Sequence, residues 1–287
     1  MIATARKTTR RRVGTSSRRA RRQSPVQHTL TGNFRMHTAF PSRFLPQTRN
    51  ILVYLPPDYE TNLTRHYPVF YMHDGQNLFD AATAYIPGND WRVDETAEEL
   101  IKKGRMEPAI IVGIYNTGVH RIDEYTPTHD PRVKAGGKAD LYGRLIVEEL
   151  KPFIDTSYRT LPGRVHTALG GSSLGGLVTL YLGLKYSHVF GRLAALSPSL
   201  WWDQHWLVRQ YQALPGKLPS KIWLDMGTRE GHTALAPVQH FRDALVHKGH
   251  HLDVDLRYYE AKGARHGERA WAKRVKPLLR FLFPPQK

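Results

Sequence analysis

The stretch "GGSSLGGL", residues 170–177, places two adjacent serines among four glycines. The segment before it, "RVHTALGG" (164–171), is typical of a buried strand. In the segment after it, "LGGLVTLYLGLKY" (174–186), apolar residues recur at helical spacing. The sequence therefore predicts a tight turn that joins a strand to a helix and carries both serines.

Within this turn, Gly171, Ser173 and Gly175 fit the pattern G-x-S-x-G. A serine in such a turn is held in strained backbone geometry, and small residues two positions away let strand and helix approach closely. The register centred on Ser172 lacks the final glycine, because Leu174 occupies that position. An ordinary glycine-rich turn is the alternative, but the flanking strand and helix favour Ser173 as a nucleophile.

A serine hydroxyl needs a base and an acid that orients the base, and in this architecture they follow the serine in the order acid, histidine. The segment "KIWLDMGTREG" (221–231) predicts a strand whose following loop carries Glu230. Asp225 is the rival acid, although its place inside the strand pattern also suits a buried structural carboxylate. His266 follows the next predicted strand and is the candidate base.

Strand and helix patterns alternate along the rest of the chain. This alternation predicts right-handed crossovers and an α/β fold, with a mostly parallel central sheet and helices on both faces. No interval is long enough for a large cap domain. The expected strands are 49–59, 67–75, 108–116, 164–171, 190–199, 221–227 and 251–260, and the expected helices are 91–104, 141–158, 174–186, 236–249 and 268–283.

The composition of the 287 residues excludes several classes of site. The absence of cysteine excludes disulfides, thiolate metal sites and a cysteine nucleophile. We expect no metal and no cofactor, and we interpret His73 and Asp74 as residues that fix a loop by hydrogen bonds rather than as metal ligands. The spacing of His247, His250 and His251 suits a solvated turn.

The net charge of +17 is concentrated at the start of the chain, where nine lysines and arginines precede residue 23. We expect residues 1–26 to be a disordered tail and residues 27–287 to form the catalytic domain, because the tail has too few apolar residues to bury. Clustered arginines attract nucleic acid or anionic surfaces weakly and without sequence preference. A solvated tail, or an artefact of an upstream start codon, is the alternative.

Location in the cell is predicted from the same segment. A secretion signal needs an apolar stretch after the arginines, and "QSPVQHTLTGNF" (23–34) is not one. No apolar run approaches the length of about 20 residues that spans a bilayer. We therefore expect a cytoplasmic protein without a membrane span, although transit peptides share the composition of the tail.

The chain resembles the Putative esterase family of α/β-hydrolases from about residue 34 to 283. That family includes enterochelin and other siderophore esterases, feruloyl esterases and mycolyltransferases. The resemblance implies that Ser173 is the nucleophile, His266 the base and Glu230 the acid, although several members carry Asp there and some siderophore esterases use a Ser-His pair. It rests on these segments in order: "YMHDGQNLFD", "NDWRVDE", "VGIYN", "RIDEYTP", "YGRLIVEELKPFIDTSYRT", "GGSSLGG", "LSPSLWW", "DMGTRE" and "HGERAW".

Acyl transfer also needs N–H donors for the oxyanion that develops on the substrate. The residue after the nucleophile, Leu174, can offer its backbone N–H from the helix N-terminus. The second donor is expected in the loop "HDGQN" (73–77), and the resemblance to the mycolyltransferases points to the N–H of Gln76.

Two further pairs of residues attract attention. Trp201 and Trp202 follow a predicted strand end, and we expect at least one of them to wall the substrate pocket, since two adjacent tryptophans in a loop are hard to bury together. Arg121 and Glu124 are spaced for a local ion pair.

The leading hypothesis is a serine carboxylesterase that acts through an acyl-enzyme on bulky or aromatic small-molecule esters of the siderophore or feruloyl type. Within this hypothesis, transfer of the acyl group to an acceptor other than water remains open. The alternative is a non-catalytic or chiefly binding protein of the same fold, which uses the arginine-rich tail on nucleic acid or anionic surfaces.

Overall fold

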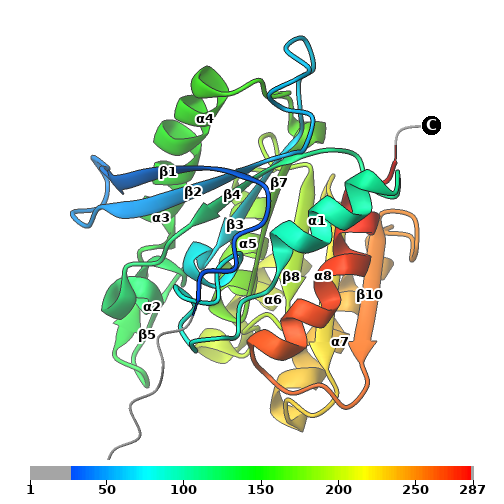
Figure 1. Ribbon diagram of the computed structural model, residues 1–287. Helices are drawn as coiled ribbons and strands as arrows, with labels where there is room; N and C mark the ends of the chain where they lie inside the picture. Colours follow the sequence, from blue (N-terminus) through cyan, green and yellow to red (C-terminus); the bar gives the residue numbers. More distant parts are fainter. Residues whose placement is uncertain (1–26, 286–287) are drawn as a thin grey trace, which may run out of the picture.

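The computed structural model describes residues 27–285, which fold around one eight-stranded sheet (Figure 1). The strands are β1 (Asn33–Phe40), β2 (Arg49–Leu55), β3 (Val69–His73), β4 (Ile110–Ile114), β7 (Thr167–Ser172), β8 (Arg192–Leu196), β9 (Lys221–Gly227) and β10 (Leu256–Ala261). Their order across the sheet is β1-β2-β4-β3-β7-β8-β9-β10. All strands from β4 to β10 in this order run parallel, and only β1 and β2 are antiparallel to their neighbours. The predicted mostly parallel sheet is confirmed.

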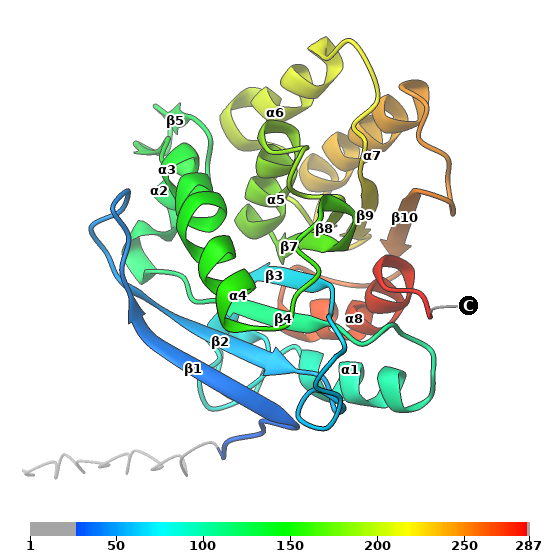
Figure 2. The same cartoon turned by 90° about the horizontal axis from the view of Figure 1, so that it is seen from above.

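Helices cover both faces of this sheet (Figure 2). On one face lie α1 (Val93–Lys102) and α8 (Glu268–Leu282), and on the other lie α3 (Ala139–Arg144), α4 (Lys151–Ser157), α5 (Leu174–Lys185), α6 (Trp202–Ala213) and α7 (His232–His247). The short elements are α2 (Arg121–Glu124), the turns η1 (Gly75–Asn77), η2 (Gly118–His120), η3 (Leu145–Leu150) and η4 (Arg164–His166), and the hairpin strands β5 (His129–Asp130) and β6 (Ala135–Gly136). This is the expected α/β-hydrolase architecture.

Each face of the sheet has its own hydrophobic core. Successive side chains of a strand point to opposite faces, so Ile51 and Val53 of β2 enter the core under α3 to α7, while Leu52 and Tyr54 enter the core under α1 and α8. Burial on both faces explains why the central strands read as continuous apolar runs rather than as alternating patterns.

Several elements differ from the sequence-based expectation. The edge strand β1, the short helix α2, the β5–β6 hairpin and the helix α6 were not predicted, and the strand expected over 251–260 begins only at Leu256. The expected single helix over 141–158 is interrupted by the π-helical turn η3, directly before Pro152. Proline has no N–H to donate to the carbonyl four residues earlier, and a wider turn absorbs this defect without ending the helix.

The N-terminal tail, residues 1–26, lies outside the described residues, so its predicted disorder stays a prediction. The first described residues are already bound to the domain: His28 Nδ1 lies 2.6 Å from Asp80 Oδ2, and the Thr31 N–H donates to Asp94 Oδ2 at 2.7 Å. No helix within residues 27–285 is both long and apolar enough to cross a membrane. The prediction that His250 belongs to a solvated turn is wrong, because its side chain is enclosed and burial lowers its pKa.

Candidate active site

Ser173 lies in the turn between β7 and α5, as the sequence predicted. Its backbone adopts φ 59° and ψ −121°, a region that residues other than glycine rarely enter. The Ser173 N–H donates to the carbonyl of Leu196 at 3.0 Å, which ties the turn to β8. A Cβ at Gly171 would lie 3.0 Å from the His73 side chain, so only glycine fits there without displacing its neighbour. The tight turn therefore places the Ser173 hydroxyl just beyond the end of β7.

The loops after β9 and β10 bring an acid and a histidine to this hydroxyl. Ser173 Oγ lies 3.0 Å from His266 Nε2, and His266 Nδ1 lies 2.6 Å from Glu230 Oε2. Because a carboxylate can only accept, Nδ1 carries the proton and Nε2 is free to accept one from the serine. The side chain of His266 is 46% exposed and that of Glu230 only 1%. A buried carboxylate therefore orients a base that water can reach.

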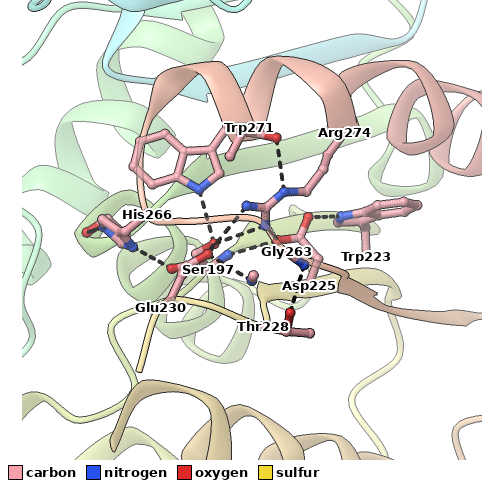
Figure 3. A network of polar contacts seen from close by, with 12 residues as sticks. Ser197, Trp223, Asp225, Thr228, Glu230, Gly263, His266, Trp271 and Arg274 are labelled. Atoms are coloured by element: carbon pink, nitrogen blue, oxygen red, sulfur yellow. Dashed lines mark hydrogen bonds and ion pairs between the residues drawn. The ribbon is translucent and has the colours of Figure 1, made fainter. Parts of the chain in front are cut away.

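Glu230 is held by a network of buried donors (Figure 3). Its Oε1 accepts hydrogen bonds from Ser197 Oγ at 2.7 Å, from the Gly227 N–H at 2.8 Å and from Arg274 Nη2 at 3.4 Å. Burial alone would raise the pKa of Glu230, but the hydrogen bonds from His266 and Ser197 outweigh it and lower that pKa. The acid is therefore ionised at neutral pH.

Ser197 is the centre of this network. Its hydroxyl donates to Glu230 and accepts hydrogen bonds from Trp271 Nε1 at 3.1 Å and Arg274 Nη1 at 3.0 Å (Figure 3). Its own φ is 43°, so it occupies strained backbone just after β8, as Ser173 does just after β7. None of these supporting residues was predicted from the sequence.

Asp225, the rival acid, contacts Ser197 and Arg274 of this network but makes no described contact with His266. It accepts hydrogen bonds from the Ser197 N–H at 3.1 Å and from Trp223 Nε1 at 2.7 Å, and it pairs with Arg274. Burial raises the pKa of Asp225, and Arg274 opposes that effect. The geometry therefore assigns Asp225 to the support of Ser197 and Arg274, and leaves the contact with the histidine to Glu230.

The second loop of the site follows β3. Asp74 takes up left-handed backbone (φ 57°) just before η1, and Gln76 is the second residue of that turn. Asp74 is fixed by Arg121, whose Nε and Nη2 each donate at 2.7 Å, and by Asn116 Nδ2 at 2.7 Å. Burial raises the pKa of Asp74, but Arg121 and Asn116 reverse this and lower it. A closed ion pair therefore holds the turn that carries Gln76.

The two predicted oxyanion donors each lie in the first turn of a helical element. Leu174 is the first residue of α5 and Gln76 belongs to η1, and the first N–H groups of a helix have no partner inside it. Gln76 is fixed on both sides, because its carbonyl accepts from Thr83 Oγ1 at 2.8 Å and its side chain accepts from the Asn116 N–H at 3.3 Å. Among residues 27–285, no hydrogen bond from the Gln76 N–H is described.

His73 lies beneath this loop and is fully buried. Its Nδ1 lies 2.8 Å from the hydroxyl of Tyr142, and burial lowers its pKa to about 3, so it is neutral. Among residues 27–285, no group of three or more histidines and carboxylates is arranged to hold a metal ion. The neutral His73 side chain packs against Gly171.

The expected ion pair between Arg121 and Glu124 is wrong. Arg121 reaches Asp74, while Glu124 is buried and forms a bidentate pair with Arg49 at 3.0 and 3.1 Å. Both residues lie in α2, which is only four residues long. Their side chains therefore find partners elsewhere, Arg121 in the loop after β3 and Glu124 at the start of β2, rather than each other.

A cleft of about 630 Å³ opens over Ser173. Gln76, Asn116 and Arg121 line its polar wall, and the exposed side chains of Tyr85 and Val119 line its rim. Neither tryptophan of the predicted pocket wall lines this cleft.

The two tryptophans lie in different surroundings. Trp202 is buried in the core and its Nε1 donates to the Thr128 carbonyl at 3.2 Å. Trp201 is 44% exposed and lines a separate groove between α6 and α7. The prediction of a substrate contact therefore remains for Trp201 alone, because the indole of Trp202 is enclosed by protein.

Comparisons with known proteins show which family the chain is similar to. Residues 42–282 match the model of a family described as Putative esterase. The chain is 26% identical over 248 residues to the uncharacterized protein YbbA of Bacillus subtilis (strain 168), covering 82% of this chain and 92% of that protein. It is 28% identical over 173 residues to the siderophore enterobactin esterase of Emericella nidulans, covering 56% and 57% of the two chains. A solved ferulic acid esterase superposes with a TM-score of 0.69 at 21% identity, covering 88% of this chain and 98% of that one.

Proposed function

The chain belongs to the Putative esterase family and is a carboxylic ester hydrolase, and we propose that it works through an acyl-enzyme on Ser173, with His266 as base and Glu230 as orienting acid. The supporting observation is the continuous line of contacts, 3.0 Å from Ser173 Oγ to His266 Nε2 and 2.6 Å from His266 Nδ1 to Glu230. Nucleophile, base and acid thus lie within the reach that proton transfer requires.

In the first half of the reaction, His266 Nε2 takes the proton from Ser173 Oγ as that oxygen bonds to the carbonyl carbon. The carbonyl oxygen becomes an oxyanion, which the N–H groups of Leu174 and Gln76 would bind. The bond to the alcohol then breaks, and His266 passes its proton to the leaving oxygen. In the second half, water repeats the attack on the acyl-serine and releases the acid.

The buried acid has an electrostatic role in both halves. His266 becomes positively charged whenever it holds the extra proton, and Glu230 stabilises that charge without taking the proton. The lowered pKa of Glu230 keeps it ionised for this purpose. Because His266 is half exposed, water reaches the acyl-serine, which favours hydrolysis over transfer to another acceptor.

We further propose that the substrates are bulky or aromatic esters of the siderophore or feruloyl type. The open cleft above Ser173 and the exposed Tyr85 and Val119 at its rim suit a large, partly apolar group. The names of the Emericella nidulans relative and of the ferulic acid esterase point in the same direction. The alternative, a chiefly binding protein, has no comparable support among the described residues.

Matched serine variants test the proposal. Ser173→Ala should lower kcat on p-nitrophenyl esters by at least about 10³-fold and abolish labelling by a fluorophosphonate probe. Ser172→Ala, at the buried end of β7, should keep both. A reversed order of effects would contradict the nucleophile, and a kcat/KM for methyl ferulate no higher than for an aliphatic methyl ester would contradict the aromatic preference.

A further inference from the structure

A second groove, of about 880 Å³, shares no lining residue with the cleft over Ser173. The cleft is lined by the loops after β3, β4 and β7 and by the first turn of α8, whereas the groove is lined by α6, by α7 and by the loop between β5 and β6. Figures 1 and 2 show where these elements lie. Its lining includes Arg132, Trp201, His205, Arg209, Thr233 and His240. Nothing in the reaction derived above uses it.

The groove begins close to the nucleophile. Ser199 Oγ lies 3.4 Å from Ser173 Oγ, and the Ser199 N–H donates to the Ser173 carbonyl at 3.0 Å. Trp201 is two residues further along, so its Cα lies within about 7.6 Å of that of Ser199. On the opposite wall, Thr233 comes three residues after Glu230. Both walls of the groove are therefore joined by short stretches of chain to residues that contact Ser173 or His266.

The lining combines one flat apolar surface with positive charge. Trp201 offers an exposed indole face. Arg209 is always charged, and within residues 27–285 it contacts the Gln204 carbonyl but has no carboxylate partner. Arg132, by contrast, is neutralised by two contacts with Asp130, at 3.0 and 2.6 Å. Of the described residues that line the groove, none carries a carboxylate.

The backbone at the groove is strained in a way that fixes its lining. Asp203, Gln204 and His205 all adopt left-handed backbone, with φ of 44°, 52° and 64°. Three consecutive non-glycine residues keep this conformation only where their surroundings hold them, and the buried indole of Trp202 and the contact of His205 Nδ1 with the Leu200 carbonyl do so. The turn lies at the start of α6 and presents Gln204 and His205 to the groove before the regular part of the helix begins.

We propose that this groove is an anion subsite of the same active site, which takes a carboxylate or similar anion carried on a planar ring of the ester substrate. The ring lies on Trp201 and the anion lies against Arg209. This inference rests on the proposed esterase function, and it adds a charge requirement that the cleft over Ser173 does not impose.

Matched substrates test the subsite on either side of the ester bond. One pair, 4-acetoxybenzoate and 4-acetoxybenzamide, carries the charge on the alcohol; the other, the methyl esters of 4-carboxycinnamate and 4-carbamoylcinnamate, carries it on the acyl group. The wild-type protein should prefer the anionic member of at least one pair at low ionic strength. Arg209→Gln should lower kcat/KM for that anion about fivefold and leave the neutral amide unchanged.

Three controls make the result specific. Arg209→Lys should retain most of the preference, because the charge remains. Arg280→Gln, which removes an exposed arginine of α8, should leave it intact. Trp201→Ala should lower kcat/KM for the aromatic substrates of the preferred pair, charged and neutral alike.

A binding measurement separates failure of the subsite from failure of the esterase. In Ser173→Ala, 4-hydroxybenzoate should quench tryptophan fluorescence more strongly than 4-hydroxybenzamide, and Arg209→Gln should remove the difference. Equal kcat/KM within both pairs, unchanged by Arg209→Gln, would overturn the subsite while leaving the esterase in place. If no ester were cleaved, the proposed function would fail, and the fluorescence result would still decide the subsite.

Discussion

Two carboxylate–arginine pairs flank Ser173, one on each side, and they differ in how the arginine is shared. Asp225 and Arg274 are both buried, and Arg274 also contacts Glu230. On the other side, Asp74 is buried but its partner Arg121 is a quarter exposed and lines the cleft. Arg274 thus contacts two carboxylates, whereas Arg121 contacts one.

The two sides therefore carry different net charge. Two carboxylates and one guanidinium leave a negative charge beside His266, which becomes positive during the proposed reaction. One carboxylate and one guanidinium leave no net charge beside Gln76, where an oxyanion would form. The negative charge on the histidine side would stabilise the imidazolium, and the neutral pair on the other side would not repel the oxyanion.

The largest expected effect comes from the acid on the histidine side. Glu230→Gln should lower kcat about 10³-fold or more, because an amide neither balances the charge of the imidazolium nor fixes the required tautomer.

Asp225→Asn should lower kcat much less but reduce stability by about 3 kcal/mol, because the buried positive charge of Arg274 loses one of its two carboxylate partners. Steady-state kinetics and thermal unfolding of both variants check this, and a greater loss of kcat in Asp225→Asn would reverse the assignment of the acid.

On the oxyanion side, removal of the arginine should cost less. Arg121→Gln leaves the Asp74 carboxylate uncompensated near the developing oxyanion, so kcat should fall by about 10- to 100-fold with a smaller change in KM. The double variant Asp74→Asn/Arg121→Gln should recover part of this loss, because it restores neutrality. Arg144→Gln, at the exposed pair with Glu148, serves as the control. If the double variant were no better than Arg121→Gln, the pair would matter for loop geometry rather than for charge.

A smaller effect is expected from Ser197, a positioning residue that acts through Glu230. The folded-state pKa of Glu230 lies below its ordinary value, so its ionised form persists at neutral pH and is lost only as the pH falls. Ser197→Ala removes one of the hydrogen bonds that lower this pKa. The acid limb of kcat/KM should therefore move to higher pH, and kcat should fall about tenfold.

A matched variant distinguishes this effect from a general loss of stability. Ser220 is equally buried, but its hydroxyl donates to the Phe190 carbonyl, away from the site. Ser220→Ala should lower the Tm by a similar amount without moving the pH profile. An unchanged acid limb in Ser197→Ala would mean that its hydroxyl is only structural.

The difference between the two sides also explains what could be predicted from the sequence. Ser173 and His266 are placed by local signals, a glycine-rich turn and a loop after a strand, and the structure brings them within 3.0 Å. Glu230 was distinguished from Asp225 by its loop position, and the structure gives only Glu230 a contact with the histidine. Their catalytic roles remain part of the proposal.

The supporting residues could not be predicted in the same way. Arg274 lies in the amphipathic helix α8, where its spacing resembles that of an ordinary solvated arginine, and only the packing of α8 on the sheet turns it inward. Arg121 was paired with Glu124 because helical spacing was the only available guide, whereas its actual partner is 47 residues away. Contacts across such distances depend on the tertiary fold, which no local pattern encodes.

The smallest expected effect concerns the segment before the domain, where deletion endpoints sharpen the comparison. Removal of residues 1–26 should leave kcat and Tm nearly unchanged, while binding to heparin falls and depends less on salt, because nine cations are lost.

Removal of residues 1–32 should in addition lower the Tm, since it breaks the contacts of His28 with Asp80 and of Thr31 with Asp94. Asp80 lies four residues after Gln76, in the same loop. The longer deletion should therefore also reduce kcat, but by less than Arg121→Gln does. Equal Tm values for the two truncations would show that these contacts do not stabilise the domain, and a loss of activity with the shorter one would move the domain boundary towards the N-terminus.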